Sequence, residues 1–174
     1  MEFQKANNRN ANIDYKPNSN DGTETNCASC VVVYEMRRRG LDITAIPYDE
    51  KNSTMFDLHE HYGSIWKNEK GGTPSVTKHK GKNFEEMKSK MLNQCKAVGR
   101  YHIGINWRDE KIEKGHVITA ERLEDDSIIF YDPQDGSFIN FNEYKELDML
   151  YIESIRVDNL IVDDDKLKII ARSL

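Results

Sequence analysis

The chain has 174 residues, is 37% hydrophobic and 32% charged, and carries a formal net charge of −5 at pH 7. This length predicts one domain with a sizeable core, and the composition is typical of a globular protein with a solvated surface. The negative charge disfavours nucleic acid and anionic membranes as partners, and no apolar run is long enough to span a bilayer. Because no signal-like segment opens the chain, we expect synthesis in the cytoplasm. Secretion by a route that needs no cleaved signal is compatible with this expectation.

Three cysteines, Cys27, Cys30 and Cys95, are too few for a disulfide framework, and their odd number leaves at least one thiol free. The Cys27-x-x-Cys30 spacing also occurs in zinc sites and redox pairs. A zinc site needs a second ligand pair, which the five histidines do not provide at a suitable spacing, and no βαβ pattern surrounds the motif. We therefore predict neither a metal nor a cofactor.

Residues 1–25 are polar and rich in Asn, which predicts an arm or linker ahead of a domain over residues 26–174. Residues 27–39 contain neither Pro nor Gly, and Gly40 fits the position after a helix C-terminus. Asn26 suits the N-cap, with its side-chain oxygen accepting a free amide N–H. Cys27 would then lie at the positive end of the helix dipole, which favours thiolate over thiol.

The same helix carries an apolar stripe and a basic end. Cys27, Cys30, Val31 and Tyr34 recur at helical spacing, whereas Arg37–Arg39 would complement the negative end of the dipole. We expect the stripe to be buried and the arginines to be a polar helix end.

The rest of the chain predicts a mixture of helices and strands. We expect a short strand at 43–46, one or two helical turns within 56–66, a helix over 84–97 that buries Cys95, strands at 101–107, 116–123 and 128–132, a short helix or turn at 142–147, a strand at 151–157, and a strand or terminal helix at 167–170. The turn-like segment 124–127 joins two of these strands as a hairpin. One helical group followed by sequential strands indicates an α+β fold.

A nucleophilic thiolate needs a base that later acts as an acid, and a group that orients that base. His116 begins a predicted strand after Gly115, and Asp132 ends the neighbouring strand of the hairpin. If residue 118 faces residue 132, His116 and Asp132 lie on one face as a diagonal pair, and Gln134 lies opposite His116. Gln134 could then share the orienting role or bind substrate. This register needs an odd-length loop such as 124–126, because a two-residue turn would separate the two side chains.

Three motifs in order carry a resemblance to a known family. They are the stretch 26–40, which begins Asn26-Cys27, then Gly115-His116-Val117, and then 130–136 with its Asp132-Pro133-Gln134 core. A further string that falls in the same order is 156–160. Together they resemble the papain-fold toxin family, whose members include glutamine deamidase domains of toxins and domains attached to phage minor head proteins. The resemblance spans roughly residues 26–160 and implies a papain-like cysteine hydrolase fold, with a catalytic helix packed on an antiparallel sheet.

The resemblance implies a Cys27, His116 and Asp132 site that attacks a carboxamide or peptide carbonyl through a thioester. The backbone N–H of Cys27 would help form the oxyanion hole, with Asn26 as a second donor. Cys30 is the alternative nucleophile, because papain also has two cysteines at this spacing and the second reacts. The favoured function is a toxin or effector that deamidates protein glutamine, with a protein substrate and an immunity protein or parent head protein as partners. A peptidase, a transglutaminase-like acyl transferase and a phage structural module remain alternatives.

Overall fold

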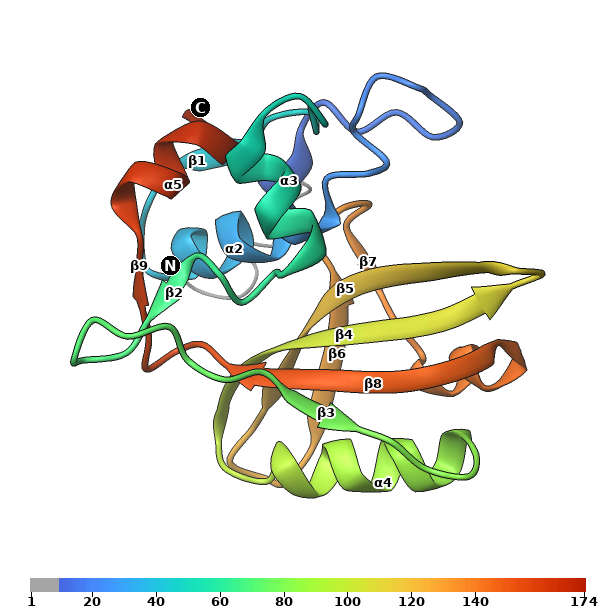
Figure 1. Cartoon of the computed structure of the whole chain (residues 1–174). Coiled ribbons are helices and arrows are strands. Elements are labelled where there is room, and N and C mark those ends of the chain that lie inside the picture. The colour runs from blue at the N-terminus through green and yellow to red at the C-terminus, as the bar shows by residue number, and fades with distance from the viewer. Residues whose placement is uncertain (1–9) are drawn as a thin grey trace. The chain divides into compact units, whose positions relative to one another are not determined.

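Two groups of secondary-structure elements make up the structure, a computed structural model that describes residues 10–174 (Figure 1). The first unit contains residues 10–74, 132–137 and 159–174, and the second contains residues 75–131 and 138–158. Helices and antiparallel strands occur in both, which confirms the α+β prediction. Among residues 10–174, no helix is both long and apolar enough to cross a membrane.

The first unit is built around α2 (Cys27–Arg38), which is buried from Ala28 to Arg37. The predicted apolar stripe therefore understates the burial, because neighbouring elements pack around the helix. These neighbours are η1 (Asn10–Asn12), β1 (Ile43–Ala45) and α3 (Ser53–Glu60). The other elements of the unit are α5 (Asp164–Ile170), β10 (Ala171–Ser173), which pairs with β1, and β2 (Trp66–Lys67), which pairs with β9 (Ile161–Val162).

The end of α2 follows the prediction in its backbone and departs from it in one side chain. Gly40 has φ +103°, its N–H donates to the Arg37 carbonyl, and the Leu41 N–H donates to the Met36 carbonyl. This pair of bonds is a Schellman motif, which satisfies the last helical carbonyls. Arg37, however, is buried, and its guanidinium donates to Asp42 and to the Ile43 carbonyl. It ties the helix to β1 as well as complementing the dipole.

Residues 10–25, the described part of the predicted arm, belong to the same unit as α2. Ala11 and Asn12 are buried, and η1 contacts both α2 and β1. The Ile13 N–H donates to Thr44 Oγ1 at 3.2 Å. This polar segment is therefore packed, and residues 1–9 of the predicted arm lie outside the described residues.

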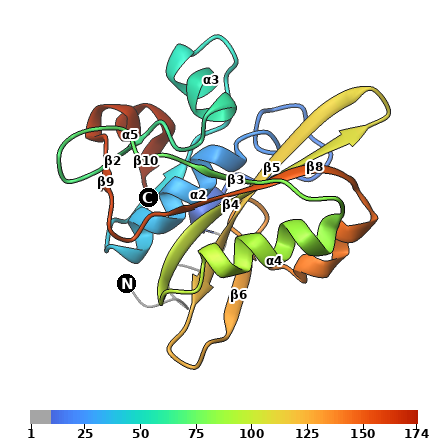
Figure 2. The ribbon, with the colours of Figure 1, turned by 60° about the horizontal axis from the view of Figure 1, so that its bottom comes forward.

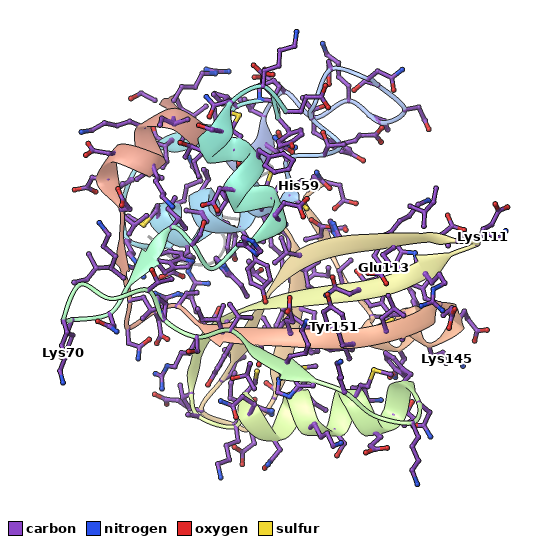
Figure 3. All side chains as sticks on the ribbon, in the orientation of Figure 1. His59, Lys70, Lys111, Glu113, Lys145 and Tyr151 are labelled. Atoms are coloured by element: carbon purple, nitrogen blue, oxygen red, sulfur yellow. The ribbon has the colours of Figure 1, made fainter. Side chains whose placement is uncertain are left out.

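The second unit is organised by an antiparallel sheet of order β3-β8-β4-β5-β6-β7. Its strands are β3 (Thr77–His79), β4 (Gly99–Asp109), β5 (Ile112–Arg122), β6 (Ile128–Asp132), β7 (Ser137–Phe138) and β8 (Asp148–Arg156). The helix α4 (Phe84–Gln94) lies along one face of this sheet (Figure 2), and η2 (Phe141–Glu146) precedes β8. The tip of the long β4–β5 hairpin is exposed, and Lys111 lies there (Figure 3).

The core of this unit forms between α4 and the covered face of the sheet. Its buried members are Phe84, Met87, Met91, Cys95, Tyr101, Ile103, Ile105, Ile118, Ala120, Phe141 and Ile152. Cys95 is fully buried, as the helical spacing predicted. Burial of this apolar surface is what holds α4 on the strands.

Candidate functional site

Cys27 is the first residue of α2, and the Cys30 N–H closes the first helical turn on the Asn26 carbonyl at 3.0 Å. The helix start is therefore where the sequence placed it. The predicted cap is wrong, because the Asn26 side chain makes no capping hydrogen bond. Its amide is engaged elsewhere, which leaves the first backbone N–H groups of α2 without a cap from this side chain.

The Asn26 amide is the centre of a buried polar network. Its Nδ2 donates to Asn12 Oδ1 at 3.1 Å and to the Ile46 carbonyl at 3.2 Å. Its Oδ1 accepts from Asn12 Nδ2, Cys30 Sγ and Gln134 Nε2 at 3.2, 3.3 and 3.2 Å. Both amide hydrogens are therefore in use. We conclude that Asn26 fixes the start of α2 to its surroundings.

Asp132 and Gln134 lie in a tight turn of the first unit, and both are buried. The Gln134 N–H donates to Asp132 Oδ1 at 2.9 Å, and the Gly136 N–H donates to the Asp132 carbonyl at 2.9 Å. An aspartate that binds the backbone two residues ahead is a common way to build such a turn. Gln134 Nε2 then reaches Asn26 Oδ1 and the Thr23 carbonyl. The turn that carries Asp132 is thus bonded to the residue before Cys27.

The loop that leads into α2 is held by the carboxylate of Asp21. This group accepts hydrogen bonds from the Ser19 hydroxyl and from the hydroxyl and backbone N–H of Thr23. Those bonds stabilise the charged form and hold the pKa of Asp21 well below its usual range. Thr23, which is buried, is therefore positioned to offer its carbonyl to Asn12 and Gln134.

The three cysteines are free, and they differ in exposure. Cys27 is half-buried, whereas Cys30 and Cys95 are fully buried. Burial raises the pKa of the Cys30 thiol well above its usual range, and the nearby Cys27 and Asp132 add to this shift. Burial also raises the pKa of Cys95 to about 11. At neutral pH Cys30 is therefore a thiol that donates to Asn26, which favours Cys27 as the nucleophile.

His116 lies on β5 in the second unit, half-buried and paired with Ile105 of β4. The β5–β6 register pairs Thr119 with Tyr131, and the Leu123 N–H donates to the Ser127 carbonyl. Three residues, 124–126, are left in the loop, with Asp126 at φ +65°, as three-residue hairpin loops require. This three-residue loop confirms the odd-length loop that the predicted register of His116 and Asp132 requires.

A sequence model of one protein family, described as papain fold toxin 1, glutamine deamidase, matches residues 25–137. This match covers more than half of the chain. The chain belongs to this family. A search of curated proteins finds no match.

The matched segment of the papain-fold toxin family contains every residue that the sequence predicted for the site: Asn26, Cys27, His116, Asp132 and Gln134. Within the first unit, the structure brings Asn26 and Gln134 together, with Asp132 held in the adjoining turn. Cys27 and Asp132 belong to that unit, and His116 belongs to the other. Within residues 10–174, no group of three or more His, Cys, Asp or Glu side chains could hold a metal ion.

Sequence reasoning missed Asn12 and Thr23, which complete the network around Asn26. Both lie in the polar segment that was predicted to be an arm. Their residue types are those of ordinary loops, so no local pattern distinguishes them. Only the packing of η1 against α2 and β1 gives Asn12 its role.

Proposed function

We propose that this protein is a cysteine hydrolase that converts glutamine side chains of a target protein to glutamate, acting as a toxin or effector. The observation that carries the proposal is the position of Cys27, a half-buried thiol at the first residue of a helix, in a member of a glutamine deamidase family. Cys27 serves as the nucleophile, His116 as the acid and base, and Asp132 as the group that orients His116.

The proposed reaction has two stages. The Cys27 thiolate attacks the side-chain carbonyl carbon of glutamine, forming a C–S bond and an oxyanion. The oxyanion collapses, the C–N bond breaks, and the protonated His116 gives its proton to the departing nitrogen, which leaves as ammonia. His116 then takes a proton from water, which attacks the thioester. The C–S bond breaks, and the products are glutamate and the free thiolate.

The start of α2 is suited to stabilise the oxyanion, and two neighbouring side chains hold it in place. The first backbone N–H groups of α2 are not capped by Asn26, and their dipoles add at this end of the helix. The amides of Asn26 and Gln134 are already bonded to each other and to the Thr23 and Ile46 carbonyls. We propose that these two side chains support the site by holding its backbone in place.

The register of the hairpin supports the pairing of His116 with Asp132. Side chains alternate along a strand, so residues 116, 118 and 120 share one side of β5. With Ala120 facing Phe130, the same alternation assigns Asp132 to that side. A two-residue turn would have placed Asp132 and His116 on opposite sides of the sheet. The shared side of the sheet supports the proposed role of Asp132 as the orienting group.

The proposal is tested by comparing cells that express the wild-type chain with cells that express Cys27→Ala. Peptide mass spectrometry should find glutamines converted to glutamate, a gain of about one dalton, with the wild type and not with Cys27→Ala. Cys30→Ala is the matched control, because it removes a thiol from the same helix and should leave deamidation in place. New peptide termini in place of mass gains would identify a peptidase, and glutamine cross-links would identify an acyl transferase. Either result would overturn the proposal.

A further inference from the structure

Asn12 forms more hydrogen bonds to the surroundings of Cys27 than its place in a polar segment suggests. It is buried, with only 2% of its surface exposed. Its Nδ2 lies 3.0 Å from the Thr23 carbonyl, 3.2 Å from Asn26 Oδ1 and 3.0 Å from the Gln134 carbonyl, and its Oδ1 accepts from Asn26 Nδ2. Three acceptors therefore share its two hydrogens, and one donor uses its oxygen.

These bonds join two segments that are far apart in the sequence. Asn26 immediately precedes Cys27, and Gln134 lies in the turn whose backbone N–H binds Asp132. The Asn12–Gln134 bond spans a sequence separation of 122 residues. A single buried amide thus connects the residue before the proposed nucleophile with the turn that carries the proposed orienting aspartate.

We infer that Asn12 is a positioning residue for the deamidation: it holds Asn26 and the 132–134 turn in one arrangement, so that Cys27 and Asp132 keep their places. This inference rests on the proposed function. An amide is needed because the site uses both its N–H donors and its carbonyl acceptor. An aspartate of nearly the same shape could still accept from Asn26, but it would face the Thr23 and Gln134 carbonyls with no hydrogen to donate.

The test compares Asn12→Asp and Asn12→Ala with the wild-type chain. Asn83→Asp and Asn83→Ala are the matched controls, because Asn83 caps α4 by accepting from the Glu86 N–H and lies in the second unit. Asn83 acts only as an acceptor in this bond, so Asn83→Asp keeps the cap. Two quantities are measured: the rate at which iodoacetamide alkylates each cysteine at pH 7, resolved by peptide mapping, and kcat and KM for ammonia release from a blocked glutaminyl-glycine dipeptide.

Both Asn12 variants should lower kcat and the alkylation rate of Cys27 by about tenfold or more, with KM within about twofold of wild type. Cys30 and Cys95 should remain unlabelled, and both Asn83 variants should behave like the wild type. If the substitutions only loosened the fold, the alkylation rate would rise at all three cysteines and not fall at Cys27. That result, or an unchanged Cys27 rate and kcat, would overturn the inference. If wild-type Cys27 is alkylated but no ammonia is released, deamidation of the dipeptide fails, while the alkylation rates still decide the role of Asn12.

Discussion

Gly22 lies in the loop that leads to Asn26 and Cys27, and alanine there should destabilise the first unit strongly. Gly22 has φ +86°, and a Cβ at this residue would lie 2.4 Å from the Tyr48 carbonyl oxygen and 2.8 Å from its nitrogen. The obstacle is backbone, and the Tyr48 N–H donates to the Gly22 carbonyl at 2.9 Å. To relieve the clash, the backbone at Tyr48 must therefore move, although it is hydrogen-bonded to Gly22.

The magnitude follows from two separate costs. A left-handed backbone costs an L-residue about 1–2 kcal/mol, and overpacking against an immobile neighbour adds about 1–3 kcal/mol. Gly22→Ala should therefore lower the free energy of unfolding by about 2–5 kcal/mol. Gly40→Ala is the matched control, because Gly40 has φ +103° but no atom within 4 Å of the added Cβ. That variant should lose only the backbone cost, about 1–2 kcal/mol.

Urea unfolding followed by tryptophan fluorescence measures this difference. Trp66 is fully buried in the first unit, and Trp107 is half-buried in the second. In a Trp107→Phe background the signal reports the unit that contains Gly22. Equal losses for Gly22→Ala and Gly40→Ala would refute the reasoning, since the contact with Tyr48 would then cost nothing.

Two further predictions concern titrating groups. Because burial raises the pKa of Cys30 well above its usual range, Cys30 should resist iodoacetamide at pH 8 in the folded protein, and rapid labelling there would contradict its assignment as a buried thiol. Burial, with the charge of Lys90, lowers the pKa of His79, whose Nε2 lies 2.8 Å from Ser154 Oγ. The imidazole of His79 therefore binds a proton more readily in the unfolded chain than in the folded protein. The contribution of His79 to the free energy of unfolding is complete above the pKa that His79 has in the unfolded chain, and it is lost as the pH falls through the lower pKa that His79 has in the folded protein. His79→Gln should therefore lose less unfolding free energy than the wild type between pH 7 and pH 5, and identical losses would show that His79 is not responsible.

Local sequence pattern predicted much of the secondary structure. The absence of Pro and Gly over 27–39, followed by Gly40, gave both ends of α2 to within one residue. Period-two alternation predicted β4, and the predicted strands at 116–123 and 128–132 fall on β5 and β6, although β5 begins four residues earlier. The register of this hairpin was predicted only on the condition of an odd-length loop, and the structure supplies that loop. These features depend on hydrogen bonds between near neighbours, so nearby residues are sufficient to predict them.

The tertiary structure alone decided which polar groups meet. Asn26 is a favourable cap in isolation, but its amide is bonded instead to Asn12 and Ile46. Asn12 looks like a loop residue, yet it is buried against Gln134. Asparagine side chains bind whichever buried backbone and amide groups the fold presents, and those partners lie far away in sequence. Local pattern therefore placed Cys27 at the first residue of α2, and long-range packing determined which groups hold the segment before it.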